Sequence, residues 1–135
     1  MGDHDVSAAE ALLEGRRAAE SLMVEECRIT ALGETVTDYH TGNVTRSKTT
    51  VYEGPCKVQS KAAAIQSAEA GEASFTVVSR EVHIPANAVE ILDGYEVEIT
   101  GSLLNAFTVG KVYRVVGFTP DTFDTATRLP VKEIL

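Results

Sequence analysis

The spacing of apolar residues changes once along this chain, and that change constrains the fold more than any other feature. Before about residue 25, apolar and small residues recur at alternating four- and three-residue steps, which places them on one face of a helix. Beyond it they alternate with polar residues, as in 26–30 and 95–100, and a period of two is typical of strands with one solvated face. The pattern predicts one N-terminal helix followed by a β-domain.

The predicted helix covers about residues 7–24. Ser7 and Glu10 have the spacing of a capping box, which satisfies free backbone amides in a first turn. Only about four of the six residues in its stripe are apolar, which favours a helix that lies on a surface over one that crosses a core. That surface belongs either to its own domain or to another subunit, and both remain open. The stripe consists of Ala8, Leu12, Gly15, Ala19, Leu22 and Glu26.

Seven short segments after the helix have the composition and alternation of strands. They span 26–30, 48–53, 56–59, 75–84, 95–100, 111–118 and 126–131. Their spacing predicts a mainly β fold, a small antiparallel β-barrel or sandwich of about six to seven strands over about residues 25–131. Helix and strands form a single domain, 1–135, because 135 residues with 44% hydrophobic side chains supply one core.

Turn-forming residues separate several of these segments. Residues 38–43 suit a hairpin tip, and Gly54-Pro55 predicts a break between two neighbouring strands. Pro130 cannot donate a ladder hydrogen bond, so the last strand is expected at a sheet edge. One long flexible loop is expected at about 61–74, where the small, polar and acidic stretch 62–73 is typical of a mobile loop or of one weak helical turn.

The charge balance argues against some classes of partner. Twelve basic and twenty acidic residues give a net charge of −8, which is opposite to the broad basic face that grips nucleic acid. Acidity is concentrated in the helix region and in 62–105, where one basic residue stands against seven acidic ones. The pattern contains neither a signal peptide nor the roughly 20 apolar residues of a membrane span. We therefore expect a protein of the host cytosol with no membrane association.

The sequence offers no persuasive catalytic or metal-binding set. His4, His40 and His83 lack the spacing of a local metal site and are expected at the surface or at a strand edge. Cys27 and Cys56 occupy the apolar phase of their strands, which favours buried packing; a disulfide between adjacent strands and a nucleophilic Cys27 remain as alternatives. We expect no enzymatic activity, no cofactor and no metal.

A small barrel that binds single-stranded nucleic acid is the alternative that the residues alone suggest. Such barrels use exposed aromatic side chains flanked by Lys or Arg. Tyr113, Arg114 and Lys57 are the candidates, but Tyr113 shares the apolar phase of its strand with Val115, which favours core packing. A protein-binding module of the same kind stays open as well.

Several motifs, taken in order, resemble those of small proteins encoded in the head-to-tail gene block of actinobacterial siphophages and prophages. The similarity extends over nearly the whole chain, and the order and spacing of the motifs carry it more than any single motif does. The motifs are 14–24 (EGRRAAESLMV), 27–30 (CRIT), 51–59 (VYEGPCKVQ), Ile84-Pro85, 93–97 (DGYEV), 112–117 (VYRVVG) and 126–131 (ATRLPV).

This resemblance implies a head-closure or stopper protein, built from a helix and a small β-barrel and assembled as a homo-oligomeric ring in the neck of the virion. The ring, a hexamer or a dodecamer, would have the portal and adaptor on one side and the tail terminator or tail tube on the other. It would seal the packaged double-stranded DNA, which passes through the bore without sequence-specific binding. The adaptor and the tail terminator remain alternative positions. No catalytic residue or cofactor is implied.

Two site hypotheses follow from the resemblance. The acidic loop would point into the bore and repel the DNA backbone. The first helix would contact the neighbouring ring. The expected lumen residues are Gln66, Glu69 and Glu72, and the expected interface residues are Leu12, Arg16, Ala19 and Met23.

Overall fold

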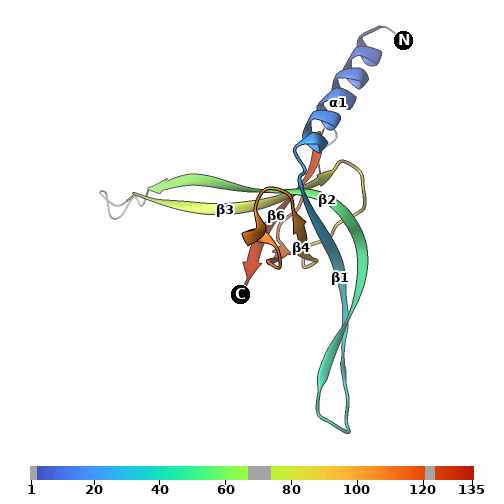
Figure 1. Cartoon of the computed structure of the whole chain (residues 1–135), viewed down its shortest axis with the longest axis vertical. Coiled ribbons are helices and arrows are strands. Elements are labelled where there is room, and N and C mark those ends of the chain that lie inside the picture. Colours follow the sequence, from blue (N-terminus) through green and yellow to red (C-terminus); the bar gives the residue numbers. More distant parts are fainter. Residues whose placement is uncertain (1–2, 67–73, 121–123) are drawn as a thin grey trace.

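The computed structural model describes residues 3–66, 74–120 and 124–135, and the side chains of 7–60, 79–120 and 124–135. Within these residues one α-helix precedes six strands (Figure 1), which confirms the predicted order of a helix and then a mainly β domain. The elements are α1 (Asp3–Ser21), β1 (Glu25–Thr37), β2 (Val44–Gln66), β3 (Ser74–Pro85), β4 (Glu96–Ser102), the 3-10 helix η1 (Ala106–Thr108), β5 (Val112–Val115) and β6 (Ala126–Ile134).

The strands form one closed antiparallel barrel in the order β1-β2-β3-β6-β5-β4. β1 closes it, because Ile29 lies opposite Tyr52 of β2 on one side and opposite Val97 of β4 on the other. Of the two predicted architectures, the chain therefore adopts the barrel. Closure leaves the barrel without a terminal edge strand, although residues 50–56 of β2 have a ladder partner on one side alone.

The predicted break at Gly54-Pro55 is wrong. The expected strands 48–53 and 56–59 are parts of the one strand β2, in which Pro55 lies opposite Glu26 of β1. A proline fits here because β2 begins to pair with β3 only at Lys57, so residue 55 has a ladder partner on one side alone.

Gly54 permits a close approach inside β2. A Cβ at this position would lie 2.9 Å from the hydroxyl oxygen of Tyr52. That hydroxyl donates a hydrogen bond to the Pro55 carbonyl at 2.6 Å. Gly54 thus leaves room for the ring of Tyr52 beside the strand. Close packing of this kind is one reason why glycine occurs in strand interiors.

The prediction that the last strand lies at a sheet edge is also wrong. β6 pairs with β3, where Pro130 lies opposite Glu81, and it pairs with β5 as well. The ladder with β5 ends at Val131, and the Val116 amide then donates to the Pro130 carbonyl at 2.9 Å. Pro130 therefore lies just past the β5–β6 ladder, where its carbonyl oxygen accepts a hydrogen bond and its nitrogen does not have to donate one.

Part of the predicted loop at about 61–74 is strand. Residues 61–66 continue β2 and pair with β3, with Ala62 opposite Val78 and Gln66 opposite Ser74. The ladder between β3 and β6 begins only at Arg80, so this stretch extends past the barrel. Its small and polar composition suggested a loop because it has few of the β-branched and aromatic residues that are typical of strands. The rest of the prediction, 67–73, lies outside the described residues.

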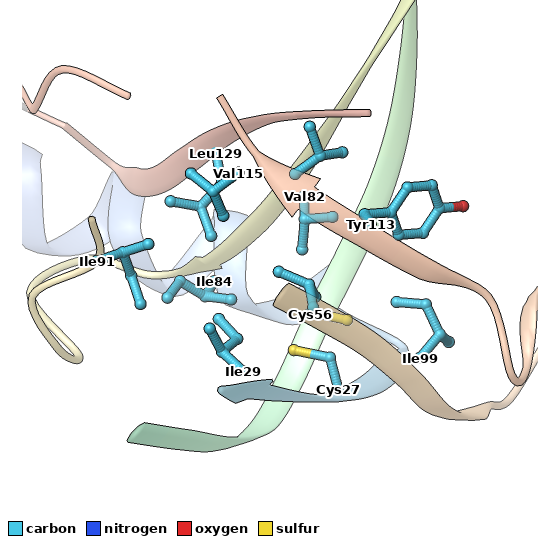
Figure 2. Close-up of a cluster of buried hydrophobic side chains, with 12 residues drawn as sticks. Cys27, Ile29, Cys56, Val82, Ile84, Ile91, Ile99, Tyr113, Val115 and Leu129 are labelled. Atoms are coloured by element: carbon cyan, nitrogen blue, oxygen red, sulfur yellow. The ribbon is translucent and has the colours of Figure 1, made fainter. Parts of the chain in front are cut away.

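The inward side chains of the barrel form one apolar core (Figure 2). Cys27, Ile29, Val97 and Ile99 are at most 1% exposed, as the apolar phase of their strands predicted. Burying an aliphatic side chain of this size stabilises a fold by about 1.5–3 kcal/mol. The other core residues are Cys56, Val82, Ile84, Ile91, Tyr113, Val115, Leu129 and Val131.

Two hairpins extend beyond the barrel in different directions (Figure 1). The β1–β2 arm comprises residues 31–49, since β1 last pairs with β4 at Thr30 but continues its ladder with β2 to Thr37. The β2–β3 arm comprises 61–66 and 74–79. The strand β2 belongs to both arms.

The helix α1 projects from the barrel in a third direction (Figure 1) and contacts β3 and β6. A Cβ on Gly15 would lie 2.9 Å from the methyl group of Thr125, and Arg16 Nε donates to the Asp124 carbonyl at 3.2 Å. Of the two surfaces left open by the sequence, the helix therefore packs on its own domain with this face.

Candidate functional site

The β1–β2 arm presents a continuous exposed surface. Every side chain from 34 to 50 is exposed, on both faces of the hairpin. Val36 and Val44 are 61% and 64% exposed, and Tyr39 at the tip is 94% exposed. These three exposed apolar side chains lie among hydroxyl groups and four charged residues, and they make the arm a candidate contact surface.

The tip of this arm is a structured turn, as predicted for 38–43. The Asp38 amide donates to the Asn43 carbonyl and the Asp38 carbonyl accepts from the Gly42 amide, both at 2.7 Å. The Asp38 carboxylate accepts from the His40 amide at 2.9 Å, and this hydrogen bond lowers the pKa of Asp38. Gly42 has a φ of +76°, where a side chain would be strained. The arm therefore ends in a defined shape.

A charged cleft of about 490 Å³ lies at the root of the arm, on the outer face of the barrel. Arg28 Nε lies 2.9 Å from Glu53 Oε1, and Arg28 Nη1 lies 3.6 Å from Glu98 Oε1. Lys48 Nζ lies 3.4 Å from Glu96 Oε1. Hydrogen bonding to Glu53 raises the pKa of Arg28. Because most of these groups face solvent, the pairs contribute little stability; they connect β4 to the two strands that form the arm.

The helix residues expected to meet another ring lie in part against the barrel of their own chain. Met23, just past the end of α1, is 7% exposed. Ala19 and Met23 line a pocket between the helix and the barrel together with His83, and Arg16 bonds to Asp124. Leu12 is half-buried. Contact of these four residues with a second ring stays a prediction, and the structure assigns three of them an intramolecular role as well.

The expected lumen residues are only partly described. Gln66 ends β2 and lies opposite Ser74, at the far end of the β2–β3 arm from the barrel. Glu69 and Glu72 lie outside the described residues. Their position in a bore stays a prediction.

The two cysteines are packing residues, as their strand phase predicted. Cys27 and Cys56 are 1% and 0% exposed, and their sulfur atoms lie close together inside the barrel as free thiols (Figure 2). Hydrogen bonding to Cys27, followed by burial, raises the pKa of Cys56 far above its ordinary value. The raised pKa disfavours the reactive thiolate form of Cys56. Both thiols are free, so the alternative of a disulfide between the two strands is not adopted.

His83 departs from its prediction as a surface or edge residue. It is 8% exposed, and its Nε2 lies 3.2 Å from Glu81 Oε1. Burial lowers the pKa of His83 against the opposing effect of Glu81, and the cations Arg128 and Lys57 lower it further. The sequence missed this burial because β3 is covered by other elements here, including the end of α1.

Tyr113 is fully buried, so it cannot stack on a nucleic-acid base. Its hydroxyl finds no hydrogen-bond partner among the residues that the structure describes. Burial raises the pKa of Tyr113. The aromatic residue on which the alternative of a single-strand-binding barrel depended is therefore part of the core.

The sequence analysis missed an exposed apolar stretch between β4 and β5. Leu103, Leu104 and Phe107 are 78%, 79% and 91% exposed. The available signal was a run of large apolar residues, SLLNAFTVG at 102–110, that follows neither a period of two nor one of 3.6.

Two features are absent from the part of the chain that the structure describes. No group of three or more His, Cys, Asp or Glu side chains lies close enough to hold a metal ion. Within the same part of the chain, no helix has the apolar length to cross a lipid bilayer.

The sequence matches a protein family over most of its length. A family of unknown function, DUF6093, matches residues 15–132. The chain belongs to this family. The match begins within α1 and ends within β6, so β1 to β5 of this DUF6093 protein and all but the last two residues of β6 lie inside it.

A solved structure has a similar fold. Protein SF1141 from Shigella flexneri 2a, determined in solution, superimposes with a TM-score of 0.51 and 15% sequence identity over 81% of this chain and 90% of its own. At that identity the similarity concerns the fold alone. No curated protein matches the sequence.

Proposed function

We propose that this DUF6093 protein is a structural subunit of the virion neck of a tailed phage, a stopper ring that seals the packaged DNA and docks the tail. The observation that carries the proposal is the pair of long hairpin arms on a small closed barrel. The partners are further copies of the chain, the portal or adaptor ring, and the tail terminator or tail tube.

The β1–β2 arm favours an assembly because it has little to stabilise it in a monomer. An isolated two-stranded hairpin is at best marginally stable in water. This arm extends over 31–37 of β1, roughly 20 Å at the rise of a strand, and its side chains from 34 to 50 bury no core. A neighbouring subunit that covers the arm would supply the missing burial, and a ring provides every subunit with such a neighbour.

The backbone edges of the arm support the same conclusion. Among the residues that the structure describes, β2 pairs only with β1 from Val44 to Thr49, and β1 pairs only with β2 past Thr30. These outer edges present amide and carbonyl groups that a strand of another molecule can pair with. An arm lying along the next barrel of a ring would cover them.

The net charge of −8 is compatible with a ring around DNA. A bore without excess positive charge repels the phosphate backbone and lets the duplex pass. The same charge disfavours the alternative of a nucleic-acid-binding barrel. That alternative predicts a gel shift at low salt that weakens steeply as salt is added, whereas a stopper subunit shows no tight binding.

Deletion of the gene from a phage or inducible prophage that encodes this chain tests the proposal. We expect electron micrographs of the lysate to show emptied heads and free tails, because an unsealed head loses its DNA and offers no site for a tail. Supplying the wild-type chain in trans should restore joined particles. Normal tailed particles from the deletion strain would overturn the proposal.

The same lysate distinguishes the stopper from its neighbours in the neck. Heads that stay filled and lack only tails indicate a tail terminator, because the seal is then intact. Loss of the adaptor removes the platform on which a stopper sits, so those heads lack every later neck protein in mass spectra of purified particles. A stopper deletion leaves the adaptor on the emptied heads.

A further inference from the structure

The connection between β4 and β5 exposes four large apolar side chains. Leu103, Leu104, Phe107 and Val109 are 78%, 79%, 91% and 45% exposed, and no charged residue occurs from 102 to 110. Single exposed apolar residues are ordinary, whereas four large ones within seven residues make a candidate interaction site. Residues 103–109 are called the apolar loop below.

The apolar loop is held in one shape by its polar groups. The Asn105 side chain accepts from the Phe107 amide at 3.1 Å, and the Ser102 hydroxyl accepts from the Asn105 amide at 3.0 Å. The Thr108 hydroxyl donates to the Glu25 carboxylate at 2.6 Å. Polar groups therefore bond within the chain while the apolar side chains face solvent. Such order lowers the entropy cost of docking.

An apolar groove of about 550 Å³ lies near the connection between β3 and β4. Ile91, at 4% exposure, joins its floor to the core, and Leu92, at 51%, is open to solvent. Val89, Phe118 and Pro120 complete its apolar lining. This volume lies in the range of pockets that enclose small ligands, so the groove can accept several side chains.

The apolar loop and the apolar groove lie at opposite ends of the β4–β5 hairpin. At the groove end, Gly94 and Tyr95 exchange hydrogen bonds with Val115 at 2.9 Å. At the loop end, the Gly110 amide donates to the Ile99 carbonyl at 2.8 Å. The seven residues of β4 separate the two ends by roughly 20 Å. One chain therefore cannot fill its own groove with its own loop.

We infer that the apolar loop of one copy docks into the apolar groove of a second copy. The loop carries no charge, and among the described residues Glu90 is the one charged side chain of the groove lining, so docking these surfaces desolvates few charges. Because different surfaces meet, the contact is heterologous: it repeats into a ring where the rotation closes and into an open chain where it does not. The inference names the subunit contact of the proposed stopper ring and rests on that proposal.

The isolated contact is expected to be weak. A stable interface buries about 800 Å² on each partner, more than four side chains of one loop supply. We therefore expect monomers in dilute solution and assembly as the concentration approaches about 1 mM. The arms supply further contacts in a complete ring.

Two single variants and their mixture test the inference in the full chain. Phe107→Asp removes the centre of the apolar loop, and Leu92→Asp places a charge at the open side of the groove. Each change should weaken self-association, measured by sedimentation velocity up to about 1 mM, by roughly tenfold or more. Circular dichroism confirms that each variant is folded, and Leu92→Asn replaces Leu92→Asp if that variant unfolds.

The mixture of the two variants decides the matter. It retains one intact loop, on the Leu92→Asp chain, and one intact groove, on the Phe107→Asp chain. We expect a 1:1 dimer that grows no further. The double variant mixed with the Phe107→Asp chain has no intact loop and should remain monomeric.

Three results would overturn the inference: a wild-type chain that stays monomeric at about 1 mM, single variants that assemble like the wild type, or a mixture that does not dimerise. A small apolar molecule retained in the groove of a monomeric chain, seen by native mass spectrometry, would also overturn it. The neck role is judged separately: emptied heads after gene deletion support the stopper even if this contact fails, and normal particles reject the stopper even if the dimer forms.

Discussion

The strands β1 and β2 run through two environments, the barrel and the β1–β2 arm. These two regions differ in side-chain burial and in strand pairing. In the barrel, Cys27, Ile29 and Cys56 are fully buried and the ladder is flanked on both sides. In the arm, every side chain from 34 to 50 is exposed and the outer edges are unpaired. The barrel is therefore stabilised by its own core, whereas the exposed side chains of the arm contribute no buried core. The predictions below measure how sharply the two regions differ.

Equivalent truncations in the two halves of β1 should have the most unequal effects. Ile29→Ala leaves a cavity in the core and should lower the free energy of unfolding by about 2–5 kcal/mol. Val36→Ala, on the exposed part of the same strand, should change it by less than about 0.5 kcal/mol. Urea unfolding followed by circular dichroism measures both. Equal effects would show that the arm and the barrel form one core.

Two tyrosines that differ in hydrogen bonding test how much each hydroxyl contributes to the stability of the barrel. Tyr113→Phe removes a buried hydroxyl without a partner among the described residues, and should raise the free energy of unfolding by about 1 kcal/mol. Tyr52→Phe loses the bond to Pro55 and should lower it by about 0.5–1.5 kcal/mol. The same unfolding experiment compares them. Destabilisation by Tyr113→Phe would mean that the hydroxyl does have a partner.

Acidification tests the buried histidine of the barrel. The pKa of His83 is lowered by burial, so the folded state binds fewer protons than the unfolded state, in which the pKa is about 6.5. Stability should be complete above that value and decrease as the pH falls through it towards the folded pKa, by at most about 1.4 kcal/mol per pH unit. Wild type and His83→Gln are compared by urea unfolding at pH 7.5 and 5.5, conditions we choose to bracket the unfolded pKa. Equal losses in both would remove His83 as the cause.

Shortening the arm should have the smallest effect on the barrel. Leu32 lies opposite Lys48, so residues 33–47 can be replaced by an Asn-Gly turn that suits a two-residue hairpin. The free energy of unfolding should change by less than about 0.5 kcal/mol, because the removed side chains bury no core. The shortened chain should nevertheless fail to restore joined particles to the deletion strain. A large loss of stability would break the distinction between arm and barrel.

The barrel was predictable because its strands alternate strictly. The phase of Cys27 and Ile29, and of Val97 and Ile99, identified inward residues that the structure confirms as core. Alternation is a signal of one-sided burial, so it reports the barrel wall well.

The arms were harder to predict because exposed strands have no such pattern. Residues 34–47 lack a buried face, and Gly54-Pro55 has the composition of a turn although it lies inside β2. The local sequence does not encode which strand flanks a proline, and both proline predictions failed for that reason. The apolar loop escaped notice because its four large apolar residues face solvent instead of the core.

The continuity of β2 has a mechanical consequence. Its 23 residues run unbroken from one arm through the barrel wall into the other. Hydrogen-bonded ladders resist stretching and shear far more than loops do, so a load placed on one arm is carried along the strand to the other. A displacement of one arm would therefore be transmitted to the other arm through the barrel wall, because both belong to the one strand β2.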